Sequence, residues 1–222
     1  MDPRILITDD GSQTVFDSSI NERYHSTFGA VTESLHVFIE SGLRSFSHFD
    51  NPFRILEVGF GTGLNALLTL IETDRQGIMV HYDALEPFPL EEKIYSSLRY
   101  PEYLERPDLC DEFLKMHRAV PDNQVLITKS YSFTKISREL QDLNCTGSFY
   151  HLVYFDAFSP EVQPELWCAE HFQKLYDSLK DGGILVTYCS KGDVKRSLAK
   201  AGFHVERLPG PPGKRHMLRA RK

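Results

Sequence analysis

Three closely spaced glycines are the residues best suited to chemistry. They stand in the stretch EVGFGTGLN, residues 57–65, directly after the apolar residues Ile55 and Leu56. Small residues at the end of a strand let the backbone approach a ligand, and the helix that follows offers unpaired N–H groups at its start. The stretch predicts either a nucleoside-binding turn or a turn needed only for tight strand-to-helix packing.

The spacing of these glycines narrows the class of ligand. They read G-x-G-x-G, whereas a dinucleotide-binding turn has G-x-G-x-x-G, and Leu64 stands where its third glycine would be. No lysine follows, which excludes a phosphate-binding P-loop. The pattern favours methyltransferases that use S-adenosylmethionine (SAM). The cofactor-binding residues predicted in this stretch are Glu57, Gly59, Phe60, Gly61, Gly63 and Asn65.

Two further acidic residues follow apolar stretches. Glu86 comes after Ile78–Leu85, and at the carboxyl end of a strand its carboxylate could accept both hydrogen bonds of a ribose diol; the alternative is a surface charge. Asp156 comes after the aromatic-rich stretch Phe149–Phe155. Because ligands of open α/β sheets bind at the carboxyl ends of the strands, we expect Asp156 both at the cofactor and at the reacting centre.

The elements that must position these residues alternate between strands and helices. This alternation predicts an α/β fold with a mostly parallel, Rossmann-like sheet. The last two strands are joined by a loop too short for a crossover helix, so they must pair antiparallel. Helices are predicted after Gly63, within 87–120, around 136–143, from 164 to the glycine pair 182–183, and up to Lys200. The predicted strands are 54–58, 78–85, 125–128, 149–155, 184–188, 203–205 and 216–218.

The first fifty residues read as an N-terminal extension. A β-hairpin is predicted from 5–7 and 14–16 around the turn Asp9-Asp10-Gly11-Ser12, followed by a helix that Gly42 ends. Tyr24 and His25 lie at the approach to that helix, where they could line a pocket or only pack. We expect one methyltransferase domain over 1–222, with 1–50 packed on it.

Composition bounds the class of protein. At 222 residues and 41% hydrophobic content the chain suits one ordinary domain. Its cysteines, Cys110, Cys145, Cys168 and Cys189, show neither a C-x-x-C pair nor zinc spacing, which predicts neither metal nor disulfides and favours a reducing cytoplasm. The start of the chain has no signal-peptide core, and no apolar run is long enough to cross a membrane, so we expect a cytoplasmic protein.

Charge is distributed unevenly along the chain. The net charge is -6, yet residues 191–222 contain ten basic and two acidic residues, so this segment carries +8 and the remainder -14. Such asymmetry indicates either a basic face for a polyanion or an ordinary solvated helix and terminus. The adjacent glycine-proline loop, residues 209–213, favours phosphate contact.

Taken together, the motifs resemble the methyltransferase domain of the MnmC family. They are GFGTGLN at 59–65, DAFSP at 156–160, PELW at 164–167, TYCSKG at 187–192 and PGPPGKRHML at 209–218, with TDDGS at 8–12 and the block 24–30. The resemblance covers nearly the whole chain. It departs at Ser130-Tyr131, where many relatives place a glycine-aspartate pair after the third strand, so the adenine contact of that region is not carried over.

The resemblance implies a class I enzyme that uses SAM to convert 5-aminomethyl-2-thiouridine at the tRNA wobble position to its methylaminomethyl form. In bifunctional members a FAD-dependent oxidase follows and prepares the amine by removing a carboxymethyl group. This chain resembles a stand-alone or excised methyltransferase without FAD, for which a separate or fused oxidase is an implied partner. The tRNA-binding residues expected from the basic segment are Lys191, Lys195, Arg196, Lys214 and Arg215.

The catalytic hypothesis follows from what methylation of an amine requires. The nucleophile must be neutral although an alkylammonium has a pKa near ~10, so orientation and help in losing a proton are required. We expect Asp156 to accept a hydrogen bond from the amine, with Tyr24 or Tyr188 as secondary contacts. Aromatic candidates for stacking on the base are Phe158, Trp167 and His216, and Cys189 is expected to be a packed small residue.

Two alternatives share the predicted fold. A small-molecule methyltransferase would have the same glycine loop and Glu86 but no need of the basic segment. A non-catalytic RNA- or nucleotide-binding module would bind RNA without methyl transfer. A NAD-dependent enzyme is disfavoured by the glycine spacing.

Overall fold

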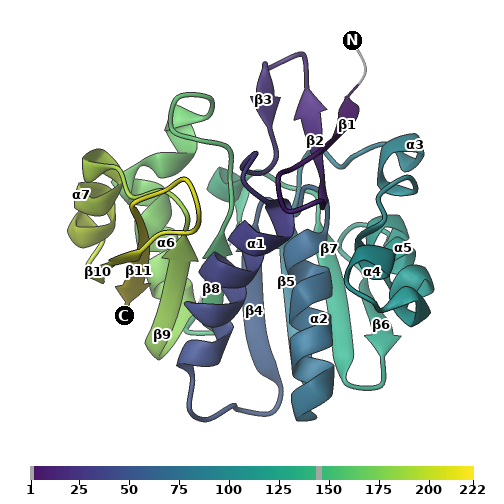
Figure 1. Cartoon of the computed structure of the whole chain (residues 1–222). Coiled ribbons are helices and arrows are strands. Elements are labelled where there is room, and N and C mark those ends of the chain that lie inside the picture. The colour runs from purple at the N-terminus through teal and green to yellow at the C-terminus, as the bar shows by residue number, and fades with distance from the viewer. Residues whose placement is uncertain (1–2, 144–146) are drawn as a thin grey trace.

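An eight-stranded sheet forms the centre of the computed structural model, which describes residues 3–143 and 147–222 (Figure 1). The strand order is β10-β11-β9-β8-β4-β5-β7-β6. The strands β7, β5, β4, β8 and β9 are mutually parallel, whereas β6, β11 and β10 run antiparallel to their neighbours. Their bounds are β4 (Phe53–Val58), β5 (Val80–Leu85), β6 (Gln124–Thr128), β7 (Tyr131–Ile136), β8 (Tyr150–Phe155), β9 (Leu179–Thr187), β10 (His204–Pro209) and β11 (His216–Arg221). The predicted Rossmann-like class and the antiparallel C-terminal pair are confirmed.

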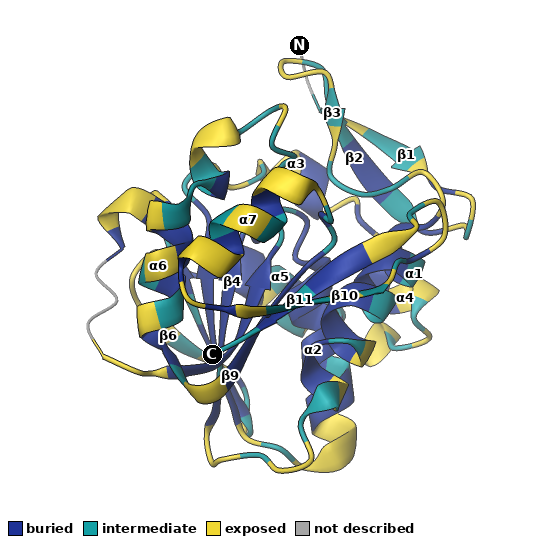
Figure 2. Ribbon diagram, turned by 90° about the vertical axis from the view of Figure 1, so that its left-hand side faces the viewer, coloured by how far each residue is buried: buried dark blue, intermediate teal, exposed yellow. Residues whose placement is uncertain are grey.

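Helices cover both faces of this sheet. Along β8, Leu152 and Tyr154 pack into one hydrophobic cluster while Val153 and Phe155 pack into the other, which explains why this strand is apolar without interruption. Figure 2 shows the strands of the central sheet mostly buried, in dark blue. The first cluster includes residues of α1 (Ala30–Ser34), its π-helical continuation η1 (Leu35–Glu40), α2 (Leu64–Gln76) and α5 (Cys110–Arg118). The second includes residues of α6 (Ala169–Ser178) and α7 (Gly192–Lys200). The short helices are η2 (Leu43–Ser45), α3 (Glu92–Tyr95), α4 (Tyr100–Tyr103), η3 (Pro107–Leu109), η4 (Leu140–Asp142) and η5 (Pro164–Trp167).

The N-terminal strands form a separate three-stranded antiparallel sheet (Figure 1). The predicted hairpin is present as β1 (Arg4–Ile7) and β2 (Gln13–Asp17), and β3 (Glu22–Arg23) adds a strand that was not predicted. Its turn supplies the cap of α1: the N–H groups of residues 30, 31 and 32 donate to Thr8 Oγ1, Ser12 Oγ and Asp10 Oδ2 at 3.2, 3.2 and 3.0 Å. Three donors that the helix leaves unpaired are thus satisfied by side chains from the turn.

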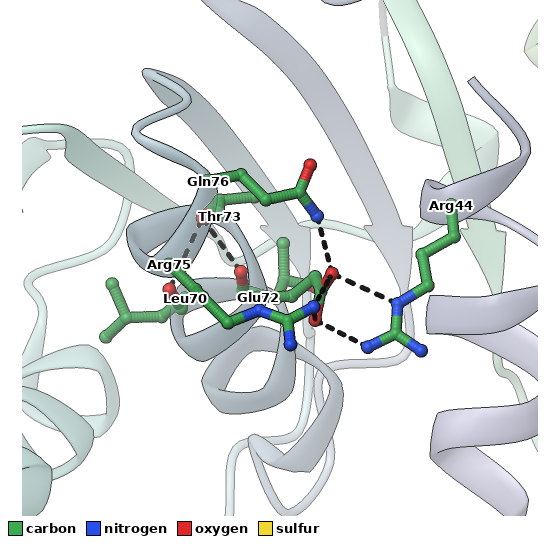
Figure 3. Close-up of polar contacts among 7 residues, drawn as sticks. Arg44, Leu70, Glu72, Thr73, Arg75 and Gln76 are labelled. Atoms are coloured by element: carbon green, nitrogen blue, oxygen red, sulfur yellow. Dashed lines mark hydrogen bonds and ion pairs between the residues drawn. The ribbon is translucent and has the colours of Figure 1, made fainter. Parts of the chain in front are cut away.

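An ion pair fixes the far end of α2. Figure 3 shows Glu72 accepting hydrogen bonds from Arg44 of η2, at 3.0 Å from Nε and 2.8 Å from Nη2, and from Arg75 at 2.9 Å. A bidentate arginine–carboxylate pair is geometrically specific. It therefore sets α2, which directly follows the glycine loop, against the segment that follows α1.

The third parallel strand lies later in the sequence than predicted. Residues 125–128 belong to the antiparallel edge strand β6, and the parallel neighbour of β5 is β7, in a region where a helix was expected around Ile136. Residues of β7 alternate strictly between buried and half-buried. Its half-buried positions include Ser132 and Thr134, and these small polar residues are the reason that the strand was not predicted from the sequence. Ser130-Tyr131 consequently lies at the amino end of β7, away from the ligand edge, and Glu139–Gln141 follow its carboxyl end. The departure from the family motif at Ser130-Tyr131 therefore lies away from the carboxyl ends of the parallel strands.

The glycine pair Gly182-Gly183 does not end a helix. Helix α6 ends at Ser178, and β9 begins at once with Leu179 and contains both glycines. The register between β8 and β9 shifts between Tyr150 and Leu152, as expected where a β-bulge interrupts a ladder. The glycines thus mark an irregularity of the strand. Within 87–120, Pro101 and Pro107 stand in the first turns of the short helices α4 and η3.

Cys110, Cys168 and Cys189 are free thiols, and Cys189 is buried as expected for a packed small residue. Cys145 lies outside the described residues. In the described ranges, no helix is both long and apolar enough to span a membrane, and no group of three or more histidine, cysteine or acidic residues could hold a metal ion.

Candidate active site

A cavity of about 840 Å³ opens at the carboxyl ends of the parallel strands. The glycine loop, Glu86 and Asp156 form its floor, and the N-terminal segment from Asp17 to Thr27 supplies much of a wall. The lining carries more acidic than basic residues. The acidic ones are Asp17, Glu22, Glu33, Glu86, Glu139, Asp156 and Glu165, and the basic ones are Arg23 and Lys214.

The glycine loop is tightly confined. Gly59 has φ +92°, and a Cβ on it would lie 2.6 Å from the backbone oxygen of Asp156. Gly61 has φ +51°, and its Cβ would lie 3.0 Å from the ring of Tyr24. Both the backbone conformation and the space require glycine. Gly63 does not line the cavity; it is the N-cap of α2 and packs on His117, so it positions the loop without facing a ligand.

Asn65 connects two carboxyl groups. Its Nδ2 donates to Glu57 Oε1 at 2.9 Å and to Asp156 Oδ2 at 2.8 Å. Glu57 is fully buried behind Asn65 and is not part of the cavity wall, so it meets the cavity only through its hydrogen bond with Asn65. Burial, reinforced by the charge of Asp156, raises the pKa of Glu57 well above its usual range.

The cavity also offers unused acceptors. Asn65 Oδ1 is buried and has no hydrogen-bond partner among the described residues, although Asn65 lines the cavity. A buried amide oxygen without a partner is costly, so a donor on a bound ligand fits there. The confined glycine loop and this unpaired acceptor thus belong to the same cavity.

Glu86 braces the glycine loop in addition to lining the cavity. Its Oε2 accepts from the N–H of Gly61 at 2.8 Å and its Oε1 from that of Phe88 at 2.9 Å. Burial raises the pKa of Glu86, and these two hydrogen bonds oppose the rise. Each carboxylate oxygen has two acceptor sites, so both can still accept a hydroxyl of a ribose diol.

Asp156 is half-buried at the end of β8 and lines the cavity. Burial raises the pKa of its carboxyl to about 7, and the negative charge of Glu33 adds to the rise. The hydrogen bond from Asn65 and the charge of Lys214 act in the opposite direction. A carboxyl that exchanges its proton near neutral pH in a cavity is a candidate for proton transfer.

Glu33 is a cavity residue that the sequence patterns missed, and Lys214 is a second cavity residue. Lys214 Nζ donates to Glu33 Oε2 at 2.7 Å and lies 4.0 Å from the centre of the Tyr188 ring. Nothing in the sequence singles out Glu33, and Lys214 was counted with the tRNA-binding residues of the basic segment. The N-terminal and C-terminal parts of the chain thus meet at the cavity.

Some of the predicted aromatic residues line the cavity, and others do not. Tyr24 and Tyr188 line the cavity, and the Tyr24 ring meets Phe158 edge-on at 5.0 Å. Trp167 is buried in the core, and its Nε1 donates to the backbone oxygen of Phe158 at 2.9 Å. His216 is exposed on β11 and does not line the cavity. Among the three candidates for stacking on a base, only Phe158 is in place.

His25 lines the cavity and also joins two parts of the structure. Its Nδ1 lies 3.0 Å from Thr14 Oγ1 and its Nε2 lies 3.5 Å from Thr62 Oγ1, so it links the N-terminal sheet to the glycine loop. Burial, aided by the charge of Lys214, lowers the pKa of His25 to about 4. The imidazole is therefore neutral at neutral pH.

The predicted tRNA-binding residues do not all remain available. Lys191 pairs with Glu161 and Arg196 with Asp193, while Lys214 is committed to Glu33. Lys195 is half-buried on α7 and Arg215 is exposed in the loop between β10 and β11. The outer face of α7 is exposed in Figure 2.

Comparison with known proteins agrees with this geometry. A family model described as S-adenosyl-L-methionine-dependent methyltransferase matches residues 108–222. The whole chain is 34% identical to the tRNA 5-methylaminomethyl-2-thiouridine biosynthesis bifunctional protein MnmC of Aromatoleum aromaticum, and 93% of it is 30% identical to the protein of that name from Delftia acidovorans. It spans 36% and 33% of their lengths. The crystal structure of MNMC2 from Aquifex aeolicus matches 98% of the chain with a TM-score of 0.79 and 27% identity, over 70% of that protein.

Proposed function

The chain belongs to a family of S-adenosyl-L-methionine-dependent methyltransferases, and on this premise we propose that it N-methylates 5-aminomethyl-(2-thio)uridine at the tRNA wobble position. The product would be 5-methylaminomethyl-(2-thio)uridine. The names of the relatives, which describe biosynthesis of this nucleoside, support the substrate. The acidic cavity carries the proposal.

An acidic cavity suits two positively charged ligands. The methyl donor carries a sulfonium, and an aminomethyl group is an ammonium before it reacts. Seven carboxyl groups against two basic side chains attract both cations and disfavour an anionic acceptor. A hydroxyl acceptor would gain nothing from this charge, so the lining favours an amine.

Asp156 is proposed to receive the proton of the substrate ammonium. An ionised carboxylate at the cavity wall can hydrogen-bond the ammonium, and a carboxyl with a pKa of about 7 can exchange a proton at neutral pH. Tyr24 and Tyr188 bound the space in which the amine is oriented. When bound, SAM supplies an electrophilic methyl group. Glu86 would hold its ribose diol, and Asn65 Oδ1 a donor group of it.

The wider setting follows from the same substrate. We propose that residues 1–222 act as one methyltransferase domain in the cytoplasm, with 1–50 as an extension that contributes Tyr24 and Glu33. A FAD-dependent oxidase, separate or fused, would prepare the amine. Exposed cations such as Arg215 would contact tRNA phosphates.

Transfer of labelled methyl groups from SAM to tRNA tests the proposal. The tRNA should come from cells that make the aminomethyl nucleoside but do not methylate it. We expect label in this tRNA and none after its amines are acetylated. Equal labelling of acetylated tRNA would contradict an amine acceptor. Labelling of the free nucleoside but not of tRNA would favour a small-molecule enzyme, and tRNA binding without labelling a non-catalytic module.

A further inference from the structure

A half-buried ion pair closes one side of the cavity. Lys214 Nζ lies 2.7 Å from Glu33 Oε2, and the exposed fractions of the two side chains are 30% and 9%. Glu33 belongs to α1, and Lys214 to the loop that joins β10 and β11. The pair therefore ties the N-terminal helix to the C-terminal hairpin.

The same ammonium is also held by an aromatic ring. Lys214 Nζ lies 4.0 Å from the centre of the Tyr188 ring, within cation–π range. The Tyr188 hydroxyl donates to the backbone oxygen of Ala157 at 3.0 Å. Because Ala157 directly follows Asp156, the contacts run from Lys214 through Tyr188 to the backbone beside the proposed proton acceptor.

Several charged or ionisable groups face Asp156, each from a different element. Glu33 of α1 raises the pKa of Asp156, and Lys214 lowers it. Glu57 of β4 and Tyr188 after β9 also interact with the Asp156 charge. The pKa values of both are raised well above their usual ranges, mainly by burial, so neither group gains charge readily. Glu33 and Lys214 are the ionised neighbours of opposite sign.

We propose that the Glu33–Lys214 pair is a positioning device for Asp156, which balances the charge around its carboxyl and holds α1 and the β10–β11 loop against it. This inference rests on the proposed function only for the use of Asp156 as proton acceptor. A lysine alone would hold the carboxyl ionised, so that it could no longer give up and take a proton near neutral pH. A glutamate alone would hold it protonated, so that it could not accept the amine proton. Lys214 is accordingly part of the active site and not a contact for RNA phosphate.

The test is a titration of the Asp156 carboxyl by carbon NMR in the free protein. Lys214→Met removes the positive charge at nearly constant shape and should raise the midpoint by roughly half a pH unit or more. Glu33→Gln removes the negative charge and should lower it by a similar amount. The double variant and Lys214→Arg should both titrate close to the original protein. Thermal melts identify variants that fail to fold; should Lys214→Met fail, the direction of the Glu33→Gln change decides alone.

The pH dependence of kcat/KM for labelled methyl transfer gives the second measurement. Its acidic limb should move with the titration midpoint, upward for Lys214→Met and downward for Glu33→Gln. Midpoints that stay unchanged, or that shift the same way in both single variants, overturn the inference. If the midpoints shift as expected while the original protein also fails to methylate tRNA, the proposed function fails and the positioning of Asp156 stands.

Discussion

Among single residues, the proposed methyl transfer depends most on the carboxyl of Asp156. Asp156→Asn keeps the shape of the side chain and an oxygen that can accept from Asn65, but removes the proton acceptor. We expect methyl transfer to fall by roughly 10²- to 10⁴-fold, as is usual for loss of a general base, while the affinity for SAM changes by no more than a few-fold. Single-turnover transfer and calorimetric SAM titration measure the two quantities. Near-normal turnover of this variant would remove Asp156 from the mechanism.

The same residue predicts a dependence of stability on pH. The folded-state pKa of Asp156, about 7, lies above the usual 3.8, so the folded protein binds the proton more tightly than the unfolded chain. Its contribution to stability is therefore lost as pH rises from about 4 to about 7. We expect Asp156→Asn to be more stable than the original protein at pH 8, by roughly 1–3 kcal/mol after allowance for screening by cavity water, and about equal at pH 4.

Urea unfolding at the two pH values measures this difference. Asp181→Asn is a suitable control because Asp181 is exposed on β9. The control should leave the free energy of unfolding nearly unchanged at both pH values. Equal stabilities of Asp156→Asn and the original protein at pH 8 would contradict the raised pKa.

Sequence patterns identified part of this site. Gly59, Gly61 and Asp156 line the cavity, and a strand end followed by glycine or aspartate has a local signature that points to this edge of the sheet. Glu57 has the same signature, yet its side chain turns away from the cavity behind Asn65. A strand pattern gives the face of a residue only when the buried and exposed faces differ, and β4 is buried on both.

At the scale of elements, the N-terminal turn acts through α1. Asp10 accepts from Ser12 at 2.6 Å through Oδ1 and from Thr32 at 3.0 and 2.8 Å through Oδ2. We expect Asp10→Ala to lower the free energy of unfolding by roughly 2–3 kcal/mol, because the cap of α1 and a part of the turn are lost together. The neighbouring Asp9→Ala removes an exposed carboxylate and serves as the matched control, with little expected change.

Activity should fall in Asp10→Ala beyond the loss of stability, since α1 also carries Glu33. Denaturant unfolding measures the first effect, and kcat/KM at a temperature where both variants remain folded measures the second. Similar losses in both variants would show that net charge in the turn, not the cap, is responsible.

Elements with clear periodicity were predicted well, and β7 was not. Its buried residues are Tyr131, Phe133 and Lys135. The Nζ of Lys135 donates to the backbone oxygen of His117, and this contact cannot be predicted from a sequence pattern. The last two strands were predicted because the intervening loop is too short for any other pairing. Local constraints are visible in sequence, whereas the choice of neighbouring strand depends on the whole sheet.

Across the whole molecule, several basic side chains of the C-terminal segment are paired with carboxylates, which leaves fewer of them to bind RNA. Arg219 and Arg221 share Glu206, and Lys214 is paired with Glu33. We expect the combined change of Lys195 and Arg215 to alanine to weaken tRNA binding and to reduce the slope of log K against log salt by roughly 1.5 to 2. Lys214→Met should leave the slope unchanged. Filter binding across a salt series measures this slope. An equal effect of Lys214→Met on the slope would show that Lys214 contacts RNA.

The meeting of the two chain ends could not be predicted. Glu33 and Lys214 are separated by most of the sequence, and neither belongs to a periodic pattern that requires the other. Their contact arises because α1 and the loop between β10 and β11 both reach the cavity at the carboxyl ends of the parallel strands. Figure 1 shows the strands β10 and β11 beside β9. The ion pair is thus a property of the completed fold.

The most direct test of the central claim is the identity of the nucleoside that receives the methyl group. Unmethylated tRNA is incubated with the protein and SAM, digested to nucleosides and analysed by chromatography and mass spectrometry. We expect 5-aminomethyl-(2-thio)uridine to disappear and its N-methyl form to appear in equal amount. The Asp156→Asn variant should form almost none of the N-methyl nucleoside. A methyl group on any other nucleoside, or on an oxygen or ring carbon, would contradict it.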